Sequence, residues 1–142
     1  MKKVYMVAAI MMFLALTPGV ALADVLAGTT LNDILLGTAI EDELRGRGGD
    51  DLLKSFAGDD YLKGGSGLDS TYGGSGNDRI IPGEGDDYVR AGDGNDLTYA
   101  RDTDSFDYID CGAGFDKVET IHRDDKTLSN CERALGPRLG NI

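Results

Sequence analysis

The sequence predicts an all-β fold, a parallel solenoid of nine-residue repeats in which two repeats make one coil. Three observations predict this fold. Aspartate recurs every nine residues from Asp33 to Asp96 without a gap. A glycine stands two places before most of these aspartates, and an aliphatic residue stands two places after most of them. Because a unit of nine residues is too short for a helical repeat, the period favours stacked turns and strands over a disordered acidic tract.

The repeat aspartate, placed at position 6 of nine, fixes the register of the repeats. Eight residues occupy this position in successive repeats: Asp33, Asp42, Asp51, Asp60, Asp69, Asp78, Asp87 and Asp96. We expect a six-residue turn followed by a strand of about three residues, whose middle side chain faces inward because side chains alternate. That inward position holds Leu, Ile or Val except at Thr71 and Thr98. Such a thin core does not offset the entropy of ordering so many glycines, so the turns need another source of stability.

A coil of 18 residues predicts two rows of stacked carboxylates. Asp33, Asp51, Asp69 and Asp87 would form one row, and Asp42, Asp60, Asp78 and Asp96 the other. Neighbours in a row would lie about 4.8 Å apart, the spacing of paired strands, and would repel one another. A hard divalent cation between turns removes the repulsion. Ca²⁺ accepts carboxylate and carbonyl oxygens in flexible geometry, whereas Mg²⁺ demands a tighter octahedron, so the rows indicate calcium.

Residues 1–23 have the pattern of a secretory signal peptide. Lys2 and Lys3 precede the apolar run VYMVAAIMMFLAL, and small residues follow as far as Ala23. The pattern predicts cleavage after Ala23, and the alternative is an uncleaved membrane anchor. We expect export by the general pathway, with the protein secreted to the extracellular space or stopping in the periplasm.

The charge of the expected mature chain argues against two classes of partner. Removing Lys2 and Lys3 from the 14 basic residues leaves 12 against 25 acidic residues, a formal charge of −13. Like charge makes nucleic acid an improbable ligand, and no membrane association is expected after signal cleavage. Either the acidic residues keep the chain disordered, or cations neutralise them.

Cys111 and Cys131 are the two cysteines of the chain. In an exported protein they most simply form one disulfide. Two free thiols and an incomplete zinc site with His122 are the alternatives.

The phrase GGSGLD, at residues 64–69, returns as GGSGND at residues 73–78. It resembles the hemolysin-type (RTX) calcium-binding repeat, Gly-Gly-x-Gly-x-Asp-x-U-x with U a large aliphatic residue. The resemblance covers residues 28–99 and implies a parallel β-roll with Ca²⁺ in the turns between neighbouring coils. It also implies which atoms hold the ion, namely the position 6 carboxylates and the carbonyls of positions 2 and 4. These ligands would be Asp51, Asp60, Asp69, Asp78, Asp87 and Asp96 with Gly65, Gly67, Gly74, Gly76, Gly83, Gly85, Gly92 and Gly94.

Several repeats depart from this motif. Leu31 and Ile40 replace the glycine of position 4 in the first two repeats, and the opening glycines of the fourth are Ser55 and Phe56. Any residue can supply a carbonyl, so these departures weaken sites rather than remove them. We expect the best sites between Asp51 and Asp96, about four to six ions in all, since calcium sites draw oxygens from adjacent turns. Weaker sites are expected at Asp33, Asp42, Asp107 and Asp116.

The strict period ends after Asp96, and the sequence there predicts one widened coil and a cap. Asp107 follows after eleven residues and Asp116 after nine, with Ile109 and Val118 in the inward position. A cap is needed because an open coil exposes a strand edge and the core. The resemblance implies that a Cys pair closes the last coil. We therefore divide the chain into a signal peptide (1–23), a β-roll (24–119) and a cap with tail (120–142).

These features predict an exported, non-catalytic calcium-binding protein that folds or becomes rigid when it binds calcium. No His-Glu-x-x-His motif and no Gly-x-Ser-x-Gly motif with a plausible triad occurs in the sequence. One alternative is a calcium-dependent surface or matrix adhesion module that uses outward tyrosines: Tyr61, Tyr72, Tyr88 and Tyr99. Another is an accessory module related to those of exoenzymes with such repeats. The sequence leaves a protein or glycan partner unidentified.

Overall fold

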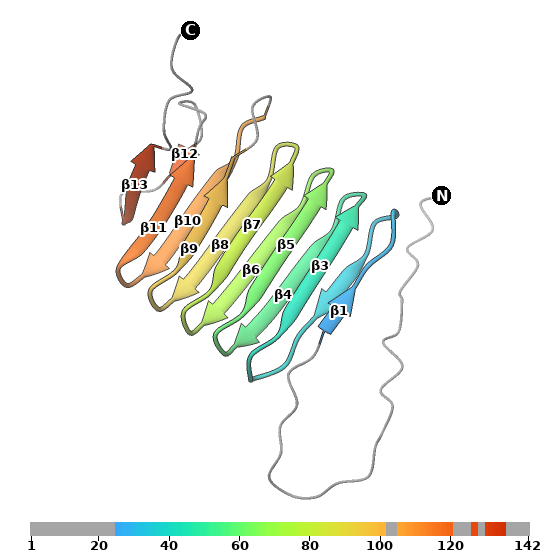
Figure 1. Cartoon of the computed structure of the whole chain (residues 1–142), viewed down its shortest axis with the longest axis horizontal. Helices are drawn as coiled ribbons and strands as arrows, with labels where there is room; N and C mark the ends of the chain where they lie inside the picture. Colours follow the sequence, from blue (N-terminus) through green and yellow to red (C-terminus); the bar gives the residue numbers. More distant parts are fainter. Residues whose placement is uncertain (1–24, 102–104, 121–125, 128–129, 136–142) are drawn as a thin grey trace, which may run out of the picture.

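The structure is a parallel β-solenoid whose two sheets face each other across a thin core (Figure 1). The computed structural model describes residues 25–101, 105–120, 126–127 and 130–135. Within these residues every ladder is parallel and no helix occurs, so none that could cross a membrane is found there either. The all-β parallel solenoid predicted from the nine-residue period is confirmed.

Successive strands alternate between the two sheets. One sheet has the order β1-β3-β5-β7-β9-β11-β13 and the other β12-β10-β8-β6-β4-β2. The strands of the first are β1 (Val25–Ala27), β3 (Glu43–Gly48), β5 (Tyr61–Ser66), β7 (Arg79–Glu84), β9 (Leu97–Ala100), β11 (Asp116–Thr120) and β13 (Cys131–Leu135). Those of the second are β2 (Ile34–Leu36), β4 (Leu52–Ala57), β6 (Ser70–Ser75), β8 (Tyr88–Asp93), β10 (Tyr108–Ala113) and β12 (Lys126–Thr127).

The register between neighbouring strands is 18 residues, which is two repeats. Leu53 pairs with Thr71 in one sheet, and Leu62 pairs with Ile80 in the other. At the widened coil the offset becomes 20, since Val89 pairs with Ile109. The predicted coil of two repeats and the predicted widening are both confirmed.

The strands are longer than the sequence predicted. Strands β3 to β8 have six residues instead of about three. The extra length comes from the turn, because Phe56 pairs with Gly74 and Ala57 with Ser75 in the same parallel ladder. Positions 2 and 3 of most repeats therefore belong to the sheet. In the first coil β1 and β2 keep only three residues.

The core is one layer of small and aliphatic side chains along the axis of the solenoid. The aliphatic residues of position 8 are buried: Leu35, Leu44, Leu53, Leu62, Ile80, Val89, Ile109 and Val118. Position 1 also faces inward, and it holds only small or compact residues such as Gly64, Pro82, Ala91 and Ala100. Thr71 and Thr98 are buried at position 8 as expected. This core buries little apolar area per residue, as the thin interior predicted.

A disulfide joins the widened coil to the following strand of the opposite sheet. Cys111 and Cys131 are bonded, with their Cα atoms 5.5 Å apart. The predicted pairing is confirmed, and neither cysteine remains free for zinc. Strands β12 and β13 then add one strand to each sheet beyond residue 119. The predicted signal peptide and His122 lie outside the described residues.

Candidate metal centre

The repeat aspartates form two buried stacks, one along each edge of the solenoid. Each of these side chains from Asp33 to Asp116 is no more than 3% exposed. In each stack the backbone N–H of one aspartate donates to Oδ1 of the aspartate 18 residues later. These N–H to Oδ1 distances are 2.7–2.9 Å from the Asp33–Asp51 pair to the Asp78–Asp96 pair. The two predicted rows are therefore present.

Both rows continue into the widened coil. The N–H of Asp87 donates to Oδ1 of Asp107 at 3.1 Å, and the N–H of Asp96 donates to Oδ1 of Asp116 at 2.9 Å. The offset between bonded aspartates changes from 18 to 20 residues here, because two extra residues lie before Asp107. The carboxylates of Asp107 and Asp116 still continue the two rows.

The second carboxylate oxygen has a different environment. Oδ2 is buried without a hydrogen-bond donor at five of these residues: Asp51, Asp69, Asp78, Asp96 and Asp116. A buried polar atom without a partner costs about 1–3 kcal/mol, and more when it carries charge. A stack of such atoms is therefore expected to hold either protons or cations.

The pKa values of these carboxyls reflect the same burial. Burial raises the pKa of Asp78 to about 7, and neighbouring carboxylates Asp96 and Asp60 add to the shift, while the N–H of Asp60 opposes it. Burial likewise raises the pKa of Asp51 and of Asp96 to about 6, and it raises the pKa of Asp60 and Asp69. Near neutral pH, a positive charge is needed to keep the rows fully ionised.

Glycine at position 1 lets two oxygen atoms approach the backbone closely, as Gly64 and Gly73 show. A Cβ added to Gly64 would lie 2.5 Å from Oδ2 of Asp69 and 2.2 Å from the carbonyl oxygen of Pro82 in the next coil. At Gly73 the corresponding atoms are Oδ2 of Asp78 and the carbonyl oxygen of Ala91. Each of these glycines thus lies against both a carboxylate oxygen and a carbonyl oxygen of the next coil, with no room for a side chain. Sequence reasoning did not single out these position 1 carbonyls.

The fourth repeat has a hydroxyl at position 1. Ser55 stands at position 1, and its hydroxyl donates to the carbonyl oxygen of Gly73 at 2.7 Å. This carbonyl is therefore already engaged, which agrees with the weaker motif of that repeat.

The glycines predicted to supply carbonyls at positions 2 and 4 have positive φ. The values run from 118° at Gly74 to 146° at Gly94 among the eight glycines predicted to supply carbonyls. A Cβ at Gly74 would lie 2.0 Å from the carbonyl oxygen of Phe56 in the preceding coil. Gly74 is therefore required for two reasons, the backbone conformation and the close approach of the preceding coil.

The arrangement fits a hard cation better than a transition metal. Among the described residues no three Asp, Glu, His or Cys side chains converge on one point. A cation in the rows must therefore take some of its ligands from backbone carbonyls, as Ca²⁺ does and Zn²⁺ does not. The buried Oδ2 atoms, the carbonyl oxygens beside them at position 1 and the oxygen-only donor set all fit calcium.

A second ladder, which sequence reasoning missed, runs beside the buried rows. The exposed side chain of position 5 accepts the N–H of position 5 in the next coil, for example Asp59 from Asn77 at 2.7 Å and Asn77 from Asn95 at 3.0 Å. The other acceptors on this ladder are Asn32, Asp50, Asp86 and Asn95. The signal was an Asn or Asp directly before the repeat aspartate. The turns that these bonds join are thus held from both sides. Leu68 interrupts the ladder, and Phe106 and Phe115 end it, because these side chains have no acceptor atom.

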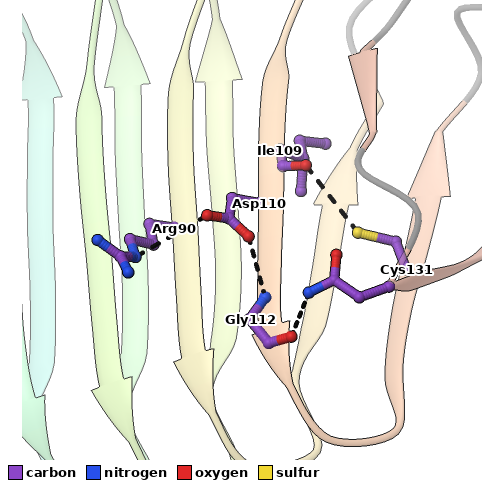
Figure 2. A network of polar contacts seen from close by, with 6 residues as sticks. Arg90, Ile109, Asp110, Gly112 and Cys131 are labelled. Carbon is purple, nitrogen blue, oxygen red and sulfur yellow. Dashed lines mark hydrogen bonds and ion pairs between the residues drawn. The ribbon is translucent and has the colours of Figure 1, made fainter.

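At the C-terminal end the disulfide takes the place of a carboxylate. Cys131 pairs in register with Asp116, so it stands where the second row would have its next aspartate. Figure 2 shows Cys131 with its Sγ facing the carbonyl oxygen of Ile109, 4.0 Å away. The side-chain amide of the preceding Asn130 donates to the carbonyl oxygen of Gly112. The row of carboxylates therefore ends in a covalent bond between coils.

Stacked coils of two nine-residue repeats, with a buried aspartate at each turn, define the protein as a parallel β-roll built from nonapeptide repeats. A family model for the RTX calcium-binding nonapeptide repeat, in four copies, matches residues 36–71 and 72–105. The chain belongs to this family of RTX repeat proteins, as the sequence resemblance indicated. No curated protein matches the chain.

Proposed function

We propose that the protein is an exported, non-catalytic calcium-binding β-roll whose turns are held together by Ca²⁺. The observation that carries the proposal is the series of buried Oδ2 atoms without donors in both aspartate rows. Family membership supports calcium as the ion. Bound calcium would neutralise the stacked carboxylates and would accept carbonyl oxygens from the turns.

The proposed ligands are those that the motif implies, with one addition. The carboxylates are Asp51, Asp60, Asp69, Asp78, Asp87 and Asp96, with weaker sites at Asp107 and Asp116. The carbonyls are those of the position 2 and position 4 glycines from Gly65 to Gly94. The carbonyls of Pro82 and Ala91 approach Gly64 and Gly73 closely, next to Oδ2 of Asp69 and Asp78, so these position 1 carbonyls are further candidates.

Calcium binding is proposed to supply folding free energy. The core is a single aliphatic layer, and the rows bury carboxylates that repel one another. Ligand binding to the folded state alone stabilises it by mass action. The roll should therefore be much less stable in a chelator than in millimolar calcium.

Two measurements on the chain from Asp24 onward test this function. Circular dichroism is recorded in about 5 mM calcium, which is enough to fill weak extracellular sites, and again in excess chelator. Native mass spectrometry counts the ions, with about four to six expected. The proposal fails if the spectra are identical and well folded in both conditions, or if no calcium is bound.

Export is proposed from the signal peptide pattern of residues 1–23. The disulfide between Cys111 and Cys131 supports an oxidising destination, outside the cytoplasm. N-terminal sequencing of protein recovered from the medium and from the periplasm should give Asp24 as the first residue. A mature protein that retains Met1 in the cytoplasm would exclude this part of the proposal.

A second candidate function is calcium-dependent adhesion, and one feature of the surface favours it. Tyr72, Tyr88 and Tyr108 form a row along the outer face of one sheet. The rings of Tyr88 and Tyr108 are stacked with centroids 5.3 Å apart, and the ring of Tyr72 is tilted against Tyr88 at 5.9 Å. On the other sheet, Arg79 lies over the rings of Tyr61 and Tyr99. Binding to a glycan array in calcium, lost in chelator and lost in Tyr88→Ala, would support adhesion over passive calcium binding.

A further inference from the structure

The turns of the first coil differ from those of Asp51, Asp69, Asp78 and Asp96 in how the repeat aspartate is satisfied. The backbone N–H of Thr29 donates to Oδ2 of Asp33 at 2.5 Å, and its hydroxyl donates to the same oxygen at 2.9 Å. Thr38 does the same to Oδ2 of Asp42, at 2.6 Å and 3.1 Å. The oxygen that has no donor at Asp51 thus has two donors in each turn of the first coil.

The threonine hydroxyl also closes the turn on its other side. It accepts the N–H of the residue at position 4, from Leu31 to Thr29 at 3.1 Å and from Ile40 to Thr38 at 3.4 Å. Each first-coil turn is therefore a self-contained hydrogen-bonded loop. Ser and Thr commonly replace backbone interactions in this way.

The different backbone conformation of the first-coil turns goes with the threonine at position 2 and does not result simply from the loss of glycine there. Arg47 and Phe56 also occupy position 2 without being glycine, yet they keep the positive φ of the later turns, at 85° and 75°. Their turns remain in the extended ladder, where Arg47 pairs with Gly65 and Phe56 with Gly74. In the first coil the ladder stops at Ala27 and Leu36, before either threonine.

We propose that Thr29 and Thr38 take the place of the cation in the first coil, so that this coil is calcium-independent and the cation sites begin at Asp51 and Asp60. The inference rests on the proposed function, since it assigns which turns take calcium. Two N–H or O–H dipoles aimed at Oδ2 supply the positive potential that a cation supplies elsewhere, and they occupy the approach to that oxygen.

This inference changes the reason for expecting weak sites at Asp33 and Asp42. Leu31 and Ile40 at position 4 do not remove a carbonyl, because every residue has one. The donors of Thr29 and Thr38 instead engage the carboxylate itself. Calcium selectivity between turns is then set by one side chain at position 2.

Calcium counting on carboxamide variants tests the assignment. In the double variant Asp33→Asn, Asp42→Asn, the number of calcium ions in native mass spectrometry and the rise in Tm on adding calcium should equal those of the wild type. The matched double variant Asp69→Asn, Asp78→Asn should bind fewer ions and show a smaller rise. If the first variant loses ions, the inference is overturned while calcium binding itself stands. If the wild type binds none, the proposed function and the inference fail together.

Removing the threonines tests the same idea in the opposite direction. The double variant Thr29→Gly, Thr38→Gly should free Oδ2 of Asp33 and Asp42 and let both turns adopt the conformation of the later turns. The protein should then bind one or two more calcium ions. Thr30→Gly is the matched control, because Thr30 is an exposed neighbour in the same turn with no bond to Asp33 in the described contacts. An unchanged ion count in a folded Thr29→Gly, Thr38→Gly protein contradicts the inference. If that variant does not fold, the ion counts of the Asp→Asn variants still decide whether the inference holds.

Discussion

The backbone N–H of Asp60 donates to Oδ1 of Asp78 at 2.9 Å, while Oδ2 of Asp78 is buried without a donor. One carboxylate therefore has two roles. Its Oδ1 joins adjacent coils and is satisfied by the protein, whereas its Oδ2 requires a proton or a cation. This division explains how the same residue can define the fold and depend on an ion for stability.

Replacing Asp78 with Asn should have opposite effects with and without calcium. The amide oxygen still accepts the Asp60 N–H, but the charge that attracts the ion is gone. In calcium at about a hundredfold excess over Kd, we expect up to about 2.7 kcal/mol less stabilisation by the ion. In chelator near pH 7.5, Asp78→Asn should be at least as stable as the wild type, because it removes a buried charge. Denaturant melts in the two conditions measure both effects.

Asp59→Asn is the matched control for Asp78→Asn. Asp59 is the exposed residue directly before Asp60, and its Oδ1 accepts the N–H of Asn77. Asparagine preserves this acceptor, so neither calcium stoichiometry nor stability should change by more than about 0.5 kcal/mol. Equal losses in the two variants would mean that general negative charge, and not the buried row, binds calcium.

The stability of the roll without calcium should fall as pH rises. Burial raises the pKa of Asp51 and Asp96 to about 6 and of Asp78 to about 7, above the usual 3.8 of an aspartate. The folded state therefore binds more protons than the unfolded state between pH 4 and 7. The stabilisation that these bound protons give to the folded state is complete below about pH 4 and is lost as the pH rises through 6 to 7.

Calcium should reverse this dependence, because the ion needs ionised carboxylates. Thermal melts between pH 4 and 8 in chelator should give a falling Tm, and the same series in calcium a rising one. A Tm in chelator that rises from pH 5 to 7.5 would contradict the assignment of protons to the rows.

Gly74→Ala should destabilise the roll far more than Phe56→Ala. The two residues are paired at position 2 of adjacent coils. Gly74 has φ of 118°, and a Cβ there would lie 2.0 Å from the carbonyl oxygen of Phe56, so alanine meets both strain and a backbone clash. We expect a loss of about 2–3 kcal/mol or more. Phe56 already carries a Cβ at φ of 75°, so its change to alanine should cost about 1 kcal/mol or less. Urea melts in saturating calcium compare the two.

Breaking the disulfide should release the C-terminal coil. The bond closes a sequence separation of 20 residues, which corresponds to about 3 kcal/mol in the chain-entropy model. Cys111→Ser, Cys131→Ser should lower the urea midpoint in calcium and should increase hydrogen exchange in β11 before β5. A uniform increase across the roll would instead indicate that the disulfide stabilises the whole solenoid cooperatively.

Several parts of the fold followed from the sequence because the repeat is strict. The nine-residue period fixed the coil length, the two rows and the inward position of Leu53 and Val89. The spacing of Asp107 and Asp116 was sufficient to predict one widened coil. Strand length could not be predicted, because whether positions 2 and 3 join a ladder depends on the coil above and below them.

The candidate site was predicted only in part for the same reason. Sequence identified the repeat aspartates and the position 4 glycines, whose φ values are positive where a turn needs them. It did not identify the position 5 ladder of Asp59 and Asn77, since an exposed Asn or Asp has many uses in a turn.

The sequence by itself determined the periodic features: the register, the buried carboxylates and the glycine turns. Those features repeat locally, and a period of nine leaves few ways to stack them. Only the tertiary structure decided which carboxylate oxygens have donors. Thr29 donates to Oδ2 of Asp33 within one turn, whereas the carboxylate of Asp51 accepts an N–H of the preceding coil at Oδ1 and has no donor at Oδ2. It also placed Cys131 beside Asp116, across a gap in the period. Hydrogen bonding of a buried charge depends on three-dimensional neighbours, and no spacing along the chain specifies it.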